Sequence, residues 1–542
     1  MSVHPDAPVA APDDLTEAER NQIAPYVTCT DGPVFALINL PESVKGALFA
    51  RYSRSAKSLR RILLEEFLPD APPQHDATNR ADKADAFYGR VLAEYGDDSV
   101  AQLGAAHIAV EGASNVLTKV IEWGRLASYL EQSTRYIAYD DRPGGTYRYH
   151  RPSAVMERPS LRAPYVKTLD DAFDAYATLF PQMVDHVAAR MPIGEVPEAA
   201  HRRAVRARAL DSVRGLLPAA TRSNVGIFAS GQAYEAMLVR MLGHPLAEAR
   251  ATAALILEEL RKVIPAFLTR VDRPDRGERH GAYLRELDAT AAELATEILG
   301  SGRPETDGPI VRLVDFDPDG EARVLAHALW SASSRSLEEV RSEVARLPSA
   351  DVGAALIRIA GTRADRRYRP GRSLEATGYA FEVVCDYGAY RDLQRHRLLS
   401  LQVQTLTPAL GYHVPDDIHN AGLTDAFTAV QKSSGALHDV LASEHPESAP
   451  YAVTMAHRVR FTMVMNAREA MHLIELRSLP QGHESYRRVA QAMHRLIADQ
   501  AGHHAIAEMM SFVDHSGSEG GRLEAEARAS RRHDPQLQSG PR

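Results

Sequence analysis

The chain is short of cysteine, of net positive charge and of long apolar segments, and each shortage excludes a class of protein. Only two cysteines, Cys29 and Cys385, occur in 542 residues. This usage excludes a disulfide framework and a cysteine-rich metal site, and it suits a reducing cytoplasm. A formal net charge of −8 argues against general nucleic-acid binding, because that binding depends on neutralising phosphates. No apolar run approaches the roughly 20 residues that span a bilayer.

What remains is an ordinary globular composition, with 44% hydrophobic and 25% charged residues. The length predicts two or three domains. The N-terminus lacks the basic region and the apolar core of a signal peptide. We therefore expect a cytoplasmic protein whose partners include neither a membrane nor a nucleic acid.

Polar segments and segments rich in Pro and Gly divide the chain. Residues 1–24 and 516–542 are expected to be disordered tails. Breaks at Thr269–Gly281 and Gly300–Gly308 separate a first domain, residues 25–300, from a second, residues 301–515. Apolar spacing predicts one strand, Thr377–Asp386, and a series of helices. The helices are expected at 43–66, 81–95, 161–191, 196–217, 246–268, 282–299, 338–347, 452–476 and 484–498.

One stretch places three groups that can carry positive charge side by side: Arg395, His396 and Arg397. Such a cluster is either a solvated basic turn or a site for an anion or a planar polar ring, since Arg offers a rigid donor fork. A second copy of the surrounding pattern occurs at Glu122–Tyr136, and it decides between the two interpretations. With Arg125 placed on Arg397, Leu126–Ser128 falls on Leu398–Ser400 and Ser133 falls on Thr405.

Together the two copies resemble the signature of the flavin-dependent thymidylate synthases. That signature is Arg-His-Arg, then seven residues and a Ser, with an acid two residues before the Ser and an Arg two after it. The later copy keeps Arg395, His396 and Arg397 but has Val403, Thr405 and Thr407 for the acid, Ser and Arg. The earlier copy keeps Glu131, Ser133 and Arg135 but has Trp123–Gly124 for Arg-His. In the family the triplet mainly holds the flavin and the other three hold the nucleotide, so the losses are complementary.

A third stretch, Phe461–Glu475, is expected to be helical, with Arg468, His472 and Glu475 along one stripe. Taken alone, the stripe could be a solvated face. The stretch resembles the family's C-terminal helix, with Asn-x-Arg followed by Leu-Arg. The resemblance assigns Asn466 and Arg468 to the flavin and Arg477 to the nucleotide, and His472 stands where the family often has Asn or His.

The matching stretch of the first half, Ser230–Met241, has Ser230 for the Asn and Gln232 for the Arg. The first half instead keeps Val213–Pro218, which resembles the family's Arg-x-x-Leu-Pro. That resemblance assigns Arg214 to the nucleotide phosphate; without it, Arg214 is a surface charge in an Arg-rich helix.

The resemblance implies an α+β protein with two tandem flavin-dependent thymidylate synthase-like domains, each a mixed sheet plus long helices. It implies reductive C5-methylation of dUMP, with FAD as cofactor and with NADPH and methylenetetrahydrofolate as co-substrates. One composite site would take Glu131, Ser133, Arg135, Arg214 and Arg477 for the substrate, with Arg477 also catalytic, and Arg395, His396, Arg397, Asn466, Arg468 and His472 for the cofactor. We expect a homodimer, a pseudo-tetramer of such domains, without a metal.

Two other interpretations stay open. Departures such as Trp123–Gly124 and Val403 allow C5-alkylation of another pyrimidine nucleotide with the same flavin. The chain could also be a non-catalytic, nucleotide-binding paralogue. A thymidylate synthase that depends on a catalytic cysteine is a poor match, because Cys385 lies in an apolar predicted strand and is expected to be a buried structural thiol.

Overall fold

The computed structural model describes residues 5–6, 15–40, 45, 48–49, 51–52, 55–68, 105–193, 196–300, 302 and 304–517. These residues form two compact units. The first unit comprises residues 1–181, 213–304 and 418–454, and the second comprises residues 182–212, 305–417 and 455–542. None of the described helices combines the length and the apolarity that crossing a bilayer requires.

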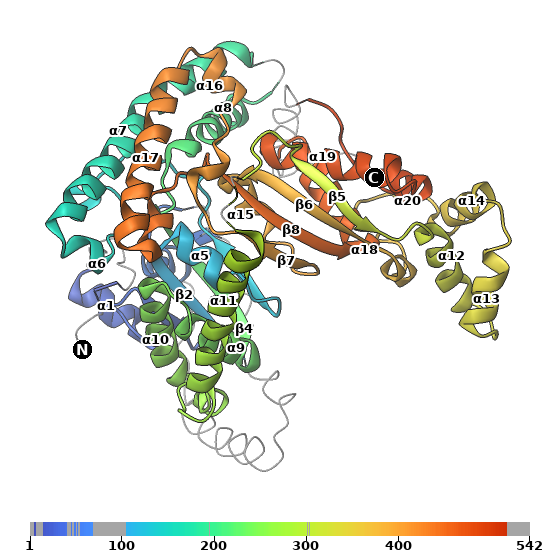
Figure 1. Cartoon of the computed structure of the whole chain (residues 1–542). Coiled ribbons are helices and arrows are strands. Elements are labelled where there is room, and N and C mark those ends of the chain that lie inside the picture. The colour runs from blue at the N-terminus through green and yellow to red at the C-terminus, as the bar shows by residue number, and fades with distance from the viewer. Residues whose placement is uncertain are drawn as a thin grey trace, which may run out of the picture. The chain divides into compact units, whose positions relative to one another are not determined.

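The first unit is built on one four-stranded antiparallel sheet. Its strand order is β1-β2-β4-β3, and helices α5, α9 and α10 contact the sheet (Figure 1). The strands are β1 (Val34–Leu37), β2 (Ala105–Ser114), β3 (Ala127–Glu131) and β4 (Arg222–Ser230). The helices are α1 (Glu17–Ile23), α3 (Leu59–Ile62), α5 (Asn115–Ile121), α6 (Ser153–Met156), α9 (Gly231–Leu242), α10 (Ala247–Arg261), α11 (Gly277–Leu299) and α17 (Thr424–Glu444).

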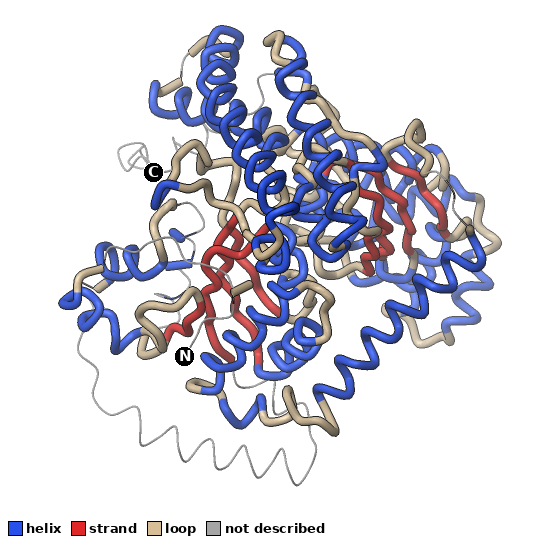
Figure 2. The backbone as a smooth tube through the Cα atoms, turned by 60° about the vertical axis from the view of Figure 1, so that its left-hand side comes forward, coloured by secondary structure: helices blue, strands red, loops and turns tan. Residues whose placement is uncertain are grey.

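The second unit repeats this plan with the order β5-β6-β8-β7. Figure 2 shows the strands of each unit gathered into one sheet with helices alongside. The strands are β5 (Val311–Phe316), β6 (Gly378–Asp386), β7 (Ser400–Val403) and β8 (Arg458–Asn466). The helices are α12 (Gly320–Trp330), α13 (Leu337–Val344), α14 (Ser349–Ala360), α15 (Tyr387–Leu393), α18 (Ala467–Arg477), α19 (Glu484–Asp499) and α20 (His504–Met509). The division between units crosses α7 (Pro159–Arg190), α8 (Glu198–Val213) and α16 (Asp416–Asn420).

Strand register shows that the two sheets are copies of one pattern. Ser128 of β3 pairs with Phe228 of β4, and the matching Ser400 of β7 pairs with Val464 of β8. The alignment that placed Ser128 on Ser400 is therefore reproduced by backbone pairing. The α+β duplication is confirmed, while the expected mixed sheets are corrected, since every pair of named strands is antiparallel.

Matching helices also begin in matching ways. A side chain at the end of β2 or β6 caps the next helix: Ser114 accepts from Leu117 N, and Asp386 accepts from Ala389 N. At the ends of β4 and β8, the side chains of Ser230 and Asn466 likewise cap the helices that follow. Short polar side chains are preferred at these positions because they satisfy backbone N–H groups that the first helical turn leaves unpaired. Each cap fixes where a strand ends and where a site-bearing helix starts.

The helix predictions from the sequence differ from the structure in several places. The helix predicted at 43–66 is interrupted at residues 55–58, and α3 begins only at Leu59. Residues 452–476 were predicted as one helix, but they contain strand β8 followed by helix α18. Alternate side chains of β8 are buried, a period of two that residues such as Met463 and Met465 satisfy as readily as a helical period. The N-terminal tail contains helix α1 where disorder was expected, because Thr16 and Glu19 form a capping box. The helix predicted at 81–95 and the tail beyond residue 517 lie outside the described residues.

Candidate functional site

In the first unit, the signature acid Glu131 lies at the end of β3 and is buried. Its Oε2 is 3.1 Å from the Nζ of Lys119, and the same ammonium is 2.5 Å from Oε2 of Glu122. Lys119 and Glu122 come from α5 and its C-terminal cap, so three charged groups meet under the strand end. Burial makes such a group costly unless each charge is paired. Lys119 therefore holds Glu131 in a defined position.

The other predicted nucleotide residues of this unit follow two local motifs. Ser133 Oγ accepts a hydrogen bond from Arg135 N at 3.2 Å, which closes a tight turn directly after β3. The Arg135 side chain is half-buried. Arg214 is buried at the start of a 3₁₀ turn, Arg214–Leu216, that continues from α8. Arg214 is therefore not the surface charge that the alternative interpretation of its helix predicted.

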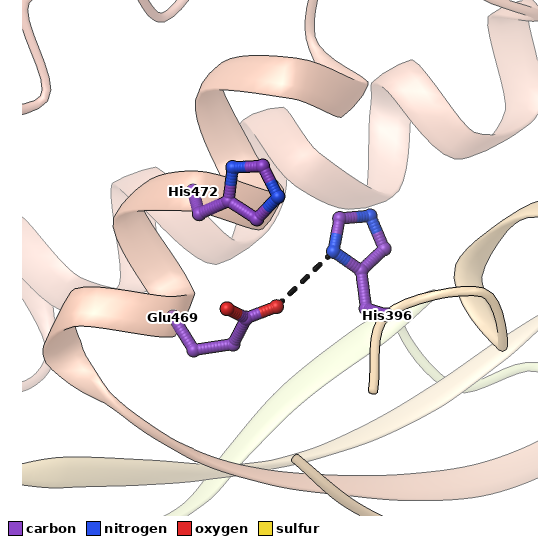
Figure 3. A group of neighbouring side chains, drawn as sticks. All are labelled: His396, Glu469 and His472. Carbon is purple, nitrogen blue, oxygen red and sulfur yellow. Dashed lines mark hydrogen bonds and ion pairs between the residues drawn. The ribbon is translucent and has the colours of Figure 1, made fainter. Parts of the chain in front are cut away.

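In the second unit, a chain of hydrogen bonds joins three side chains. Arg477, at the end of α18, donates from Nε to Nε2 of His396 at 2.9 Å. The opposite ring nitrogen of His396, Nδ1, lies 3.2 Å from Oε1 of Glu469 (Figure 3). Both His396 and Glu469 are buried. Arg477 also donates from Nη2 to the carbonyl oxygen of Asp392 at 2.6 Å, and its guanidinium lies over the ring of Tyr486.

The predicted stripe on α18 faces an Arg-rich loop, residues 361–371, and the turn that follows it. Arg468 donates to the carbonyl of Pro370 at 3.1 Å, and Arg369 Nη2 lies 3.1 Å from Nδ1 of His472. Glu475 accepts two hydrogen bonds from Arg363, at 2.6 and 2.7 Å. The interpretation of this stripe as a solvated face is therefore wrong: a fork-shaped ion pair fixes the loop against the helix.

The remaining predicted flavin residues occupy two different settings. Arg395 and Arg397 are exposed on either side of the buried His396, and Arg395 lies 3.5 Å from Asp392. The side chain of Asn466 is the N-cap of α18 and accepts from Glu469 N at 2.9 Å. Asn466 therefore has a structural role at the start of α18, in addition to the flavin contact that the resemblance implies.

Burial and positive neighbours shift the ionisable groups around His396. Burial raises the pKa of Glu469 to about 7, although Arg369 and Arg468 oppose the shift. Burial, helped by the charge of Arg477, lowers the pKa of His396 well below its ordinary value. Burial and Arg369 lower the pKa of His472 to about 4. Both imidazoles are therefore neutral at neutral pH.

His396, Glu469 and His472 each bring one possible metal-ligand atom within 4.8 Å of the others (Figure 3). Their hydrogen bonds argue against a metal there. Arginine can only donate, so Arg477 uses the lone pair of His396 Nε2 and places the ring proton on Nδ1. Arg369 acts in the same way on Nδ1 of His472 and places that proton on Nε2. Neither ring has a lone pair left for a cation.

The first unit has no such group at the matching positions. Gly124 stands for His396 and Ala233 for Glu469, while Ala236 and Met241 stand for His472 and Arg477. A Cβ added at Gly124 would lie 2.7 Å from the Tyr129 hydroxyl oxygen, so a phenol takes up the neighbouring space. Conversely, Val403 of the second unit stands for Glu131. Each unit thus carries a polar group where its counterpart is apolar or small.

Residues 47–266 and 312–512 match the family model described as thymidylate synthase complementing protein. The chain belongs to this family and is a tandem duplication of its flavin-dependent thymidylate synthase-like domain. The resemblance found in the sequence is confirmed at the level of the family.

Among its relatives is a UPF0159 protein of Chlamydia muridarum, which is 36% identical over 525 residues, covering 95% of this chain and 98% of the relative. A flavin-dependent thymidylate synthase of Clostridium tetani is 23% identical over 180 residues, 32% of this chain and 66% of that protein.

Two solved structures are also similar. The UMP/dUMP methylase PolB of Streptomyces cacaoi, solved with 5-Br dUMP, is 19% identical, and the match covers 36% of this chain and 94% of that chain with a TM-score of 0.30. The flavin-dependent thymidylate synthase ThyX of Helicobacter pylori, solved with FAD and dUMP, is 18% identical and covers 38% of this chain and 100% of its own, with a TM-score of 0.28.

Sequence reasoning missed the residues that hold the predicted ones in place. Lys119 is a single charge in an apolar segment, and its spacing from Glu131 carries no signal before the strand pairing is known. Glu469 follows Arg468 directly and reads as one more polar helix residue. A pairwise comparison of the halves would have marked Glu469, because Ala233 occupies its place in the first half.

Proposed function

We propose that the chain is a flavin-dependent thymidylate synthase that converts dUMP, methylenetetrahydrofolate, NADPH and a proton into thymidylate, tetrahydrofolate and NADP⁺ with FAD as cofactor. The observation that carries the proposal is the complementary retention of signature residues in a chain whose two halves both match the family. Random decay would remove nucleotide and flavin residues from both halves alike.

The second unit supplies the groups that suit a flavin nucleotide. Arg395 and Arg397 present guanidinium groups at the surface beside His396, and these groups are suited to a pyrophosphate. Arg468 and the amide of Asn466 lie at the start of α18, and His472 lies one turn further on. When bound and reduced, the flavin would supply the hydride; the protein binds and orients the reactants. The residues present thus fit the cofactor.

The first unit supplies the groups that suit a nucleotide monophosphate. Arg135 and Arg214 offer donor forks and Ser133 a hydroxyl for a dianionic phosphate. Glu131, held by Lys119, offers an acceptor for the pyrimidine edge. We assign Arg477 of the second unit to the pyrimidine as well, as a donor that polarises the ring. We propose a homodimer as the working assembly, with both sets of residues contributing to each reaction.

The test is product analysis with the purified chain, FAD, NADPH and methylenetetrahydrofolate, in parallel with dUMP and with UMP. We expect bound FAD, thymidylate from dUMP and little product from UMP. A product only from UMP would assign the enzyme to another pyrimidine nucleotide. A chain that takes up no FAD and does not rescue a thymidine-requiring strain lacking other thymidylate synthases would contradict the proposal.

A further inference from the structure

We propose that Glu469 is a positioning residue that acts through His396 to orient Arg477 toward the nucleotide. The inference rests on the proposed function for the role of Arg477, and it adds a residue that the family signature does not include. Its basis is the hydrogen-bonded order Arg477, His396, Glu469, in which His396 and Glu469 are buried and Arg477 is nearly so.

The first step is the tautomer of His396. The guanidinium of Arg477 stays protonated in proteins, so its Nε–H can only donate to an unprotonated Nε2. The neutral ring then carries its proton on Nδ1, the atom that faces Glu469. Glu469 accepts a hydrogen bond from this Nδ1–H. It thereby fixes the ring in the orientation in which Nε2 accepts from Arg477. Rotating the ring by half a turn would place carbon atoms at both contacts.

The second step is the geometry of Arg477. Its side chain is 14% exposed, so it reaches the surface while most of it is enclosed. His396 fixes the Nε edge, the Asp392 carbonyl fixes Nη2, and Tyr486 lies against the flat face. Losing the His396 contact would free rotation about the last bonds of a long side chain. A planar donor gains its specificity from orientation, so this rotation weakens recognition of a pyrimidine.

The third step is the contrast between the two units. The first unit lacks the arginine, the histidine and the carboxylate together, and Met241, Gly124 and Ala233 stand in their places. A carboxylate needed only to cap or solubilise α18 would have no reason to be lost with its two partners. Cap formation at this helix uses Glu469 N and the Asn466 side chain, and Ser230 performs the same task on α9 without any carboxylate.

The inference also changes what His396 can do for the cofactor. Both of its ring nitrogens are engaged, one with Arg477 and one with Glu469. Contact with a flavin would therefore use the ring face or its carbon edge. His472 lies at the side of this ring, with the two centroids 5.5 Å apart and the planes at 61°.

The experiment compares Glu469→Ala and Glu469→Gln with the full-length wild type, using dUMP binding, FAD binding and steady-state kinetics. We expect Glu469→Ala to weaken dUMP binding and raise the KM for dUMP by about 10- to 100-fold, the value of one charge-assisted hydrogen bond. FAD affinity should fall by less than dUMP affinity, because the proposed cofactor site also has Arg395, Arg397 and Arg468. Glu469→Gln keeps a carbonyl acceptor and should recover most of the loss. Arg346→Ala, at an exposed ion pair far along the chain, is the matched control.

A second measurement needs no turnover and tests the hydrogen-bonded order Arg477, His396, Glu469 directly. This order is called the relay below. Nitrogen-15 spectra of the histidine-labelled chain, with His396 assigned by its loss in His396→Gln, should show a neutral ring protonated at Nδ1. Glu469→Ala should abolish that single-tautomer signature. If the chain makes no thymidylate but shows this signature, the proposed function fails and the relay stands. A ring protonated at Nε2, unchanged nucleotide binding in Glu469→Ala, or stoichiometric Zn²⁺ uptake that Glu469→Ala abolishes would each overturn the relay.

Discussion

The two units share a backbone plan and differ in where they place buried charge. Around the signature acid, the first unit has Lys119 between two glutamates. At the matching positions the second unit has Arg391, Gln394 and Val403. Around the arginine at the end of α18 the difference reverses: the second unit has the Arg477–His396–Glu469 chain, and the first unit has Met241, Gly124 and Ala233 at the matching positions. A duplicated domain can thus keep its sheet register while its two copies keep different buried polar groups.

A second difference concerns the sheets themselves. Nine of the ten residues of β2 are buried in succession, whereas burial alternates along most of β6. The first unit covers both faces of its sheet: α10 contacts it, and the N-terminal segment adds Phe49, which packs against Gly226 of β4. Full coverage favours uniform burial, and coverage of one face favours a period of two. The sheet of the first unit is therefore more fully buried than the sheet of the second unit.

The largest expected effect tests the charged group of the first unit. Lys119→Met leaves two carboxylates buried without their cation and should lower the free energy of unfolding by about 3–5 kcal/mol. Denaturant unfolding measures the change. Lys167→Met, at an exposed pair, should change stability by less than about 1 kcal/mol. A loss from Lys119→Met no larger than that of the control would show that the group is solvated.

The next effect is a pH dependence that belongs to the second unit. The pKa of Glu469, about 7 when folded and 4.5 ordinarily, is raised, so its carboxyl binds a proton more tightly in the folded chain. Stability from this group is fully present below about pH 4.5 and is lost as pH rises to about 7, by up to about 3 kcal/mol. Glu469→Gln should therefore gain stability relative to wild type across this window.

His396, His472, Arg369, Arg468 and Arg477 face Glu469 and are unchanged in that variant. The difference between the two proteins thus isolates the carboxyl group. Thermal unfolding of both at pH 4.5, 6 and 8 gives the measurement. A difference that does not vary with pH would mean that Glu469 titrates at its ordinary value.

A third comparison separates the two copies of one signature arginine. Arg397→Ala should lower FAD affinity about 10-fold or more, because it removes a charged donor from the proposed cofactor site. The matching Arg125→Ala in the first unit should leave FAD affinity unchanged. Flavin fluorescence titration of both variants is the measurement. Equal losses in both would indicate that the two units bind flavin alike, contrary to the proposed division.

The smallest effect concerns the N-caps of α9 and α18. Asn466→Ala and Ser230→Ala should each cost about 1 kcal/mol, since each removes the acceptor for one backbone N–H. Asn466→Ser keeps a cap of the first unit's kind and should cost less than about 0.5 kcal/mol. If Asn466 also donates to the cofactor, Asn466→Ser will weaken FAD binding while stability is preserved. Unchanged FAD affinity would reduce Asn466 to a cap.

The sequence predicted the parts whose signals are local. Thr377–Asp386 was predicted as a strand from its β-branched and aromatic content, and β6 occupies Gly378–Asp386. The resemblance also selected His396, His472 and Arg477, which the fold brings together on or beside α18. Strand β8 was missed because its apolar residues suit a helix until their pairing with β6 is known. Glu469 and Lys119 were missed because their partners are distant in sequence and only the fold makes them neighbours.

One irregularity of β2 has a practical consequence. Between Val110 and Ala113 this strand carries one residue more than its partner β4, and Gly112 there adopts a positive φ of 75°. The bulge directs Glu111 to Arg60 and to the backbone N–H of Leu59, whereas β6 pairs with β8 without a shift. A hybrid made by exchanging segments between the two halves must therefore allow for this extra residue. The offset between matching residue numbers of the two halves changes at this point. A graft that ignores it would turn every downstream side chain to the opposite side of the sheet.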